Sequence, residues 1–127
     1  MIRVAAIQIA PVFLDAQKTW EKLRGYIRKA KSGNADLVVW GETLIPGYPI
    51  WVNLPSAAAF NNSQQKTAYS KYWKEAIKIE DSPIIEEMMK LARELEIMLM
   101  GGIVEKYGGS DTNRHKSREH PCAENST

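Results

Sequence analysis

The spacing of apolar residues predicts a strand, a helix and a second strand at the start of the chain. Residues 2–9 are apolar on both faces of the pleat, which is typical of a strand buried on both sides. From Asp15, a good N-cap, to about Lys31, apolar residues recur every three or four positions, as on one face of a helix. Residues 37–40 form a short apolar run that predicts the second strand. This order is a βαβ unit, which favours parallel pairing.

The following residues predict a loop, two helices and a third strand. Residues 41–62 read as a long loop, and three prolines exclude regular structure from Pro46 to Pro55. Helices are expected over residues 63–77 and 83–95, the second starting with Pro at its first position. Residues 97–107 are expected to form the third strand. The pattern as a whole predicts an α/β fold.

The apolar pattern stops after residue 107. Residues 108–127 contain no Val, Ile, Leu, Met, Phe, Trp or Tyr, so they bury too little apolar surface to offset the entropy of ordering. We expect this polar segment to be disordered and residues 1–107 to build the one core that 127 residues allow. So abrupt a change suggests a frameshift, an alternative splice product or a truncated gene model.

Charge and cysteine content exclude several function classes. The 17 Lys and Arg residues are interspersed with 15 Asp and Glu, without the basic stripe of a nucleic-acid-binding protein. Cys122 cannot form an internal disulfide, and with His115 and His120 it has no zinc-site spacing, so no metal or cofactor is expected. No run approaches the roughly 20 apolar residues of a membrane span, and residues 2–9 lack the features of a signal peptide. We therefore expect a cytoplasmic protein.

Glu42 is the residue whose position points most directly to chemistry. It follows the second strand, at the edge where parallel sheets bind ligands. If Trp40, Tyr48 and Trp51 shield its carboxylate, desolvation raises the pKa toward the working range of a general base. The alternative is a carboxylate that caps a turn or forms a surface ion pair.

Three motifs resemble a known family. Residues 4–11 (Val-Ala-Ala-Ile-Gln-Ile-Ala-Pro), 35–42 (Ala-Asp-Leu-Val-Val-Trp-Gly-Glu) and 45–49 (Ile-Pro-Gly-Tyr-Pro) resemble, in order and spacing, the amino-terminal third of the nitrilase or carbon-nitrogen hydrolase superfamily. The Pro-Gly-Tyr-Pro loop followed by Trp51 is most similar to the nitrilase branch. The resemblance covers about residues 2–110.

The resemblance implies a four-layer α-β-β-α sandwich and a Glu-Lys-Cys triad that hydrolyses a small nitrile or amide without a cofactor. Glu42 matches the family's base, whereas the family's Lys and Cys come from later segments that match nothing here. Members commonly have Phe-Pro-Glu where this chain has Trp-Gly-Glu. Gly41 should loosen the backbone there and leave the carboxylate in register. Family members commonly form homo-oligomers.

Two residues of the polar segment, Cys122 and Lys116, could be mistaken for the family's catalytic Cys and Lys. Residues 122–125 (Cys-Ala-Glu-Asn) echo the family's Cys-Trp-Glu-Asn, but Ala replaces Trp and no apolar strand precedes Cys122. Lys116 lies in a basic run at 114–118, for which a solvated charged segment is the favoured interpretation. Neither residue is therefore assigned a catalytic role.

Other residues near Glu42 allow two interpretations each. Tyr48 and Trp51 either line a substrate pocket or pack back onto their own domain. Gln8 interrupts an apolar strand, which favours a buried, hydrogen-bonded amide over a supporting role at the site. The pair Gly101-Gly102 suggests a bulge or a close backbone approach.

Three functions follow from these observations. The first is a nitrilase-like hydrolase of non-peptide carbon-nitrogen bonds with Glu42 as general base. The second is a non-catalytic fragment or isoform that binds a full-length partner. The third, a nucleotide-binding domain, is disfavoured because Pro11 and Phe13 stand where a Gly-rich turn would follow the first strand.

Overall fold

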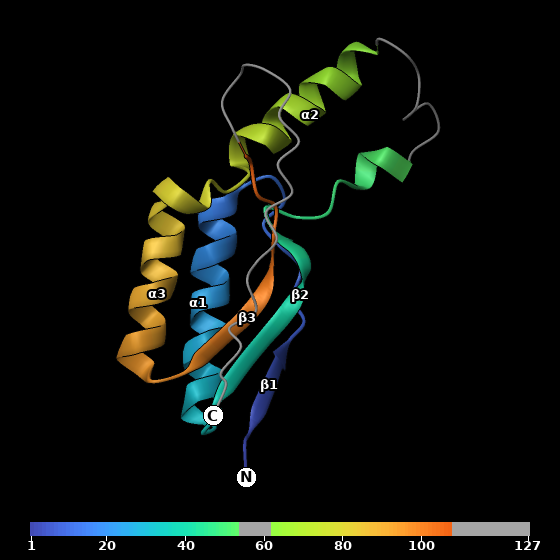
Figure 1. Ribbon diagram of the computed structural model, residues 1–127. Coiled ribbons are helices and arrows are strands. Elements are labelled where there is room, and N and C mark those ends of the chain that lie inside the picture. The colour runs from blue at the N-terminus through green and yellow to red at the C-terminus, as the bar shows by residue number, and fades with distance from the viewer. Residues whose placement is uncertain (54–61, 108–127) are drawn as a thin grey trace, which may run out of the picture.

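A computed structural model describes residues 1–53 and 62–107 as a parallel sheet with two helices packed on one face (Figure 1). The strands follow the order β1-β2-β3, as the βαβ pattern predicted for the first pair. The elements are β1 (Val4–Ile7), α1 (Ala16–Ser32), β2 (Leu37–Ile45), the 3₁₀ turn η1 (Ile50–Asn53), α2 (Ser63–Glu75), the 3₁₀ turn η2 (Ile79–Asp81), α3 (Pro83–Leu95) and β3 (Met98–Ile103). None of the described helices is both long and apolar enough to cross a membrane.

Helix α1 forms where its cap and apolar stripe predict it. The Asp15 side chain accepts a hydrogen bond from the backbone N–H of Lys18 at 2.9 Å. This bond, more than the nearby Lys18 ammonium, lowers the pKa of the Asp15 carboxyl. Trp20, Leu23 and Ile27 are fully buried against the sheet. The helix ends at Gly33.

Helix α3 has the predicted bounds but buries a different set of side chains. The apolar spacing of this helix predicts an inner face made of Ile85, Met88, Ala92 and Leu95, and of these only Met88 is buried while the other three are half-buried. The buried residues are Ile84, Met88 and Leu91. Because α3 packs beside α1 as well as on the sheet, its buried stripe is rotated toward α1.

Several polar contacts join helices α1 and α3, and one of them satisfies a buried donor. The indole Nε1–H of the fully buried Trp20 donates to Glu87 Oε2 at 2.7 Å. Arg24 Nη1 lies 3.4 Å from the same carboxylate oxygen. Glu87 on α3 therefore satisfies a buried donor and a cation of α1 together.

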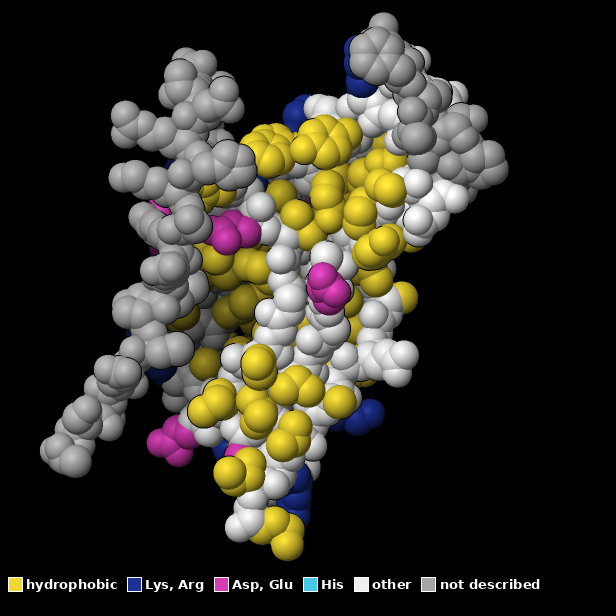
Figure 2. Space-filling view, turned by 45° about the vertical axis from the view of Figure 1, so that its right-hand side comes forward, with side chains coloured by type: hydrophobic (Ala, Val, Ile, Leu, Met, Phe, Trp, Pro, Cys, Tyr) yellow, Lys and Arg dark blue, Asp and Glu magenta, His cyan; other side chains and the backbone are white. Residues whose placement is uncertain are grey.

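One face of the sheet is apolar and open, which corrects the expectation that the first strand is buried on both sides. The register aligns Val4, Leu37 and Met98 in one row across the strands, and Ala6, Val39 and Met100 in the next. We call these six residues the open face. Val4, Met98 and Met100 are 54%, 67% and 66% exposed. Figure 2 shows hydrophobic side chains gathered on this side of the molecule. Helices α1 and α3 cover only the opposite face.

The segment after the regular part of β2 also departs from expectation. Strand β2 continues to Ile45, which pairs with Ile103 of β3 beyond a bulge. A 3₁₀ turn forms at Ile50–Asn53, although no regular structure was predicted there. Pro49 is compatible with this turn because it contributes only its carbonyl, which accepts the Val52 N–H at 3.0 Å. The N–H that proline lacks is not needed there. Residues 54–61 lie outside the described chain.

Helix α2 crosses above the carboxyl ends of the strands (Figure 1). Asn62 caps it by accepting from the backbone of Gln64 and Gln65. None of its residues is fully buried. At its other end, Glu75 accepts the backbone N–H of Ala16 at 2.9 Å, which ties the end of α2 to the first turn of α1.

Candidate functional site

Glu42 lies on a bulge of β2, at the carboxyl edge of the sheet. Pairing with β1 ends at Trp40, so Glu42 extends past the last residue of that neighbour. Thr43, the next residue, has φ of 55°, a left-handed conformation that is strained for a β-branched side chain. The bulge therefore turns the chain out of the ladder at Glu42, where parallel sheets present their ligand sites.

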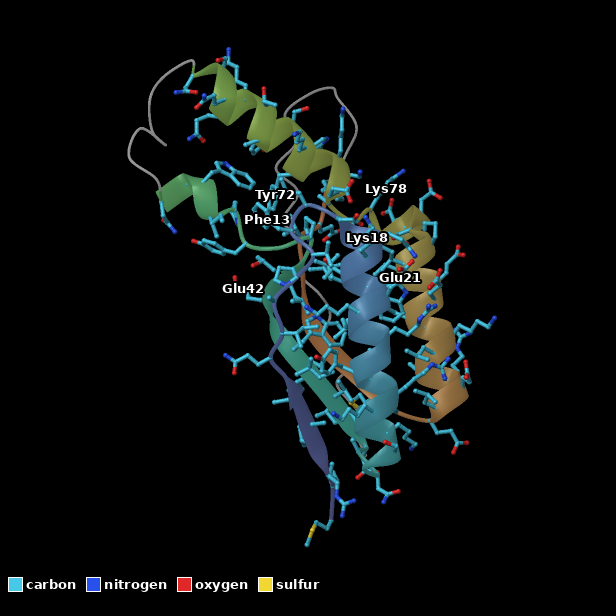
Figure 3. All side chains as sticks on the ribbon, turned by 180° about the vertical axis from the view of Figure 1, so that it is seen from behind. Phe13, Lys18, Glu21, Glu42, Tyr72 and Lys78 are labelled. Atoms are coloured by element: carbon cyan, nitrogen blue, oxygen red, sulfur yellow. The ribbon has the colours of Figure 1, made fainter. Side chains whose placement is uncertain are left out.

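The carboxylate of Glu42 is exposed, which corrects the expected shielding. Trp40 does not cover it, because its indole is buried in the core on the helix side of the sheet. Glu42 has no hydrogen-bond or ion-pair partner among the described residues. In Figure 3 it stands apart from Lys18 and Lys78, which pair with aspartates of their own segments. The surface ion-pair alternative therefore has no partner within the described chain.

A hollow of about 410 Å³ lies beside Glu42, within the size range of small-molecule sites. It is lined by Ile7, Gln8, Ile9, Pro11, Gly41, Glu42, Thr43, Leu44, Gly47 and Tyr48. Most of these residues are apolar, and the carboxylate is the one ionised group. Neither Lys nor Cys is among them. Such a lining can hold a small, mostly apolar molecule beside a group that accepts a proton.

The two aromatic candidates take different positions. Tyr48 lines the hollow together with Glu42. Trp51 instead packs edge-on between Phe13 and Tyr72, with ring centroids 6.1 Å and 5.1 Å away. Trp51 thus matches the alternative interpretation, in which the loop aromatics pack on their own domain. It braces the loop after β2 against α2.

The phenol of Tyr72, on α2, has a raised pKa. Burial raises the pKa of its phenol, and Tyr48 and Tyr69 add to the effect. The group is therefore a neutral hydrogen-bond donor at physiological pH. In the view of Figure 3, Tyr72 lies above Glu42. The carboxyl edge thus combines an exposed carboxylate with neutral aromatic neighbours.

The prediction that Gln8 is buried is wrong, and the sequence pattern did not single out Thr43. Gln8 is exposed and lines the hollow, because β1 ends at Ile7 before reaching it. Gln8 thus borders the same hollow as Glu42. Nothing in the composition around Thr43 indicates its left-handed backbone, since glycine and asparagine are the usual residues there.

Several candidates remain outside the described residues. Lys116, Cys122 and the whole polar segment 108–127 belong to this group. Within residues 1–53 and 62–107, no three His, Cys, Asp or Glu side chains come together as metal ligands would.

Comparison with known proteins places this arrangement in a family. The family model described as "Carbon-nitrogen hydrolase" matches residues 3–118. An aliphatic nitrilase of Rhodococcus rhodochrous is 37% identical over 110 residues, which are 85% of this chain and 28% of the relative. An arylacetonitrilase of Hypocrea virens is 36% identical over 110 residues, 87% of this chain and 31% of the relative. Nitrilase 2 of Arabidopsis thaliana is 31% identical over 108 residues, 85% and 32% of the two chains. The chain thus spans about a third of the length of these curated relatives. Since the family match extends over most of its residues, the chain belongs to the carbon-nitrogen hydrolase family.

Proposed function

We propose that this chain carries the general-base segment of a nitrilase-type hydrolase, with Glu42 as the base. The observation that supports this most is an exposed carboxylate, without a partner among residues 1–53 and 62–107, beside a mostly apolar hollow in a chain of this family. Relatives named as nitrilases favour a small nitrile, or the corresponding amide, as substrate. No cofactor is needed for such a hydrolysis.

In the proposed reaction, the Glu42 carboxylate removes the proton of a thiol as its sulfur attacks the nitrile carbon. The proton passes to the substrate nitrogen, which gives a thioimidate. Water adds to its carbon, and the carbon-nitrogen bond then breaks, so that ammonia departs and a thioester remains. A second water then releases the carboxylic acid. A cation that stabilises the anionic intermediate completes the site. The described lining of the hollow has neither thiol nor ammonium, so in this proposal both groups come from residues other than those that line it.

The open face supports a four-layer α-β-β-α sandwich as the complete domain. Parallel sheets are normally covered on both faces, and here one face carries helices while the other is apolar and bare. A second sheet packed about 10 Å away would cover it. The same face supports the alternative function, in which the chain is a non-catalytic fragment that binds a full-length relative or another copy of itself.

Replacing Met98 and Met100 together by Ser should reduce self-association of the isolated chain without lowering its stability. Both side chains are largely exposed, so their removal sacrifices little burial while it lowers the apolar area of the open face. We expect weaker fluorescence of an apolar dye, less light scattering and an unchanged Tm. Tyr26→Ser is the control, because Tyr26 is exposed on α1, which covers the opposite face of the sheet. An equal effect of Tyr26→Ser would contradict the prediction.

A chimera tests the proposed function. Residues 3–107 replace the matching segment of the Rhodococcus rhodochrous aliphatic nitrilase, and ammonia release from a nitrile panel is measured. We expect the chimera to be active and the 127-residue chain alone to be inactive. A folded but inactive chimera, together with binding of the 127-residue chain to the relative, would favour the non-catalytic alternative. Ammonia release by the chain alone, abolished in Cys122→Ala, would instead make Cys122 the nucleophile.

A further inference from the structure

The Gly101-Gly102 segment of β3 lies against the bulge that carries Glu42. Trp40 pairs with Gly101 and Ile45 pairs with Ile103. Residues 41–44 of β2 therefore stand opposite the single residue Gly102. Ladder hydrogen bonds do not fix the place of these extra residues, so other contacts must.

Gly102 touches the main chain of Glu42. A methyl group on Gly102 would lie 2.6 Å from Cα of Glu42 and 2.9 Å from the backbone N of Thr43. Backbone atoms cannot swing aside as the end of a side chain can. Alternation along β3 directs this methyl group to the side of Met98 and Met100, so the bulge protrudes over the open face. The missing side chain at position 102 is what lets Glu42 approach the sheet so closely.

Trp40 fixes the position of the Gly101-Gly102 segment of β3 beside the bulge. Its indole lies on Gly101, where any methyl group would overlap the ring. The Nε1–H of the same ring donates to the carbonyl oxygen of Gly102 at 3.2 Å. Trp40 is itself held in the core, where only 9% of it is exposed. The core therefore fixes Gly102, and Gly102 limits where Glu42 can lie.

We propose that Gly102, held by Trp40, is a positioning residue that sets the direction of the Glu42 carboxylate. A general base must come within about 2.6–3.2 Å of the proton it takes. A misplacement of about 1 Å in such a site lowers the rate by about 10²-fold. The catalytic consequence rests on the proposed function of Glu42, whereas the positioning itself does not.

The variant Gly102→Ala tests the contact directly in the 127-residue chain. We expect the backbone NMR resonances of Glu42 and Thr43 to shift, and the side-chain resonances of Glu42 to shift with them. Resonances of Leu23 and Ile27, on α1, should stay in place. Gly25→Ala is the control, because a methyl group on Gly25 meets no atom within 4 Å. A folded Gly102→Ala chain with unshifted Glu42 and Thr43 signals would overturn the proposal.

A second variant and a kinetic readout complete the test. Trp40→Phe keeps a ring over Gly101 but loses the Nε1–H bond, so it should shift the same signals less, and no shift would overturn the role of Trp40. In the chimera, Gly102→Ala should lower kcat by about 10²-fold with a smaller change in KM. Shifted signals without any Glu42-dependent activity would refute the proposed function alone. Glu42-dependent hydrolysis with unshifted signals would refute the positioning role alone.

Discussion

Replacing Glu42 by Gln is expected to lower kcat for nitrile hydrolysis by about 10²- to 10⁴-fold in the chimera, the range that general acid–base catalysis contributes. Glutamine has the same shape, but its amide cannot take the proton of a thiol. Glu42→Asp keeps a carboxylate and withdraws it by one methylene, so an intermediate loss is expected. Initial rates of ammonia release over a range of nitrile concentrations give kcat and KM for each variant.

The control for this substitution is Glu86→Gln. Glu86 is an exposed carboxylate on α3, outside the hollow, so the same chemical change there should leave kcat unaltered. Tyr48→Phe separates binding from proton transfer, because Tyr48 lines the hollow without offering a base. We expect it to raise KM more than it lowers kcat. Full activity in Glu42→Gln would remove Glu42 from the mechanism.

The local features of the fold could be predicted from the sequence because the residues that decide them are close together in the chain. Asp15 and the apolar stripe that follows it fix the start and the buried face of α1, and both are confirmed. The parallel pairing of β1 with β2 follows from the helix between them. The pair Gly101-Gly102 indicated a close approach, and the indole of Trp40 and the backbone of Glu42 are what approach.

The surroundings of Glu42 could not be predicted because they depend on contacts distant in sequence. An apolar strand reveals that both its faces avoid water, but what covers each face depends on other elements, so the pattern of the first strand alone does not indicate which face is open. Trp40 was expected beside the carboxylate, and alternation along β2 turns it to the helix side instead. Trp51 packs against Phe13 and Tyr72 instead of lining the hollow, and these two residues come from separate segments.

The largest effect on stability is expected for Trp20→Ala, a loss of about 3–5 kcal/mol in the free energy of unfolding. Trp20 is fully buried between α1, α3 and the sheet, so its removal opens a cavity in the core. It also leaves Glu87 without its 2.7 Å donor. Urea unfolding followed by far-UV circular dichroism measures the loss. A decrease of this size is a large share of the roughly 5–15 kcal/mol that stabilises a typical domain.

Two further variants separate the cavity from the hydrogen bond. Trp20→Phe retains an aromatic ring but loses the Nε1–H, and a bond to a charged acceptor contributes about 1.5–3 kcal/mol, so an intermediate loss is expected. Trp73→Ala makes the same large truncation on α2, where the indole is exposed, and should change the free energy of unfolding far less. Equal losses for Trp20→Ala and Trp73→Ala would contradict the prediction. Since Trp20 joins α1 to α3, its loss should also lower the protection of both helices in hydrogen exchange.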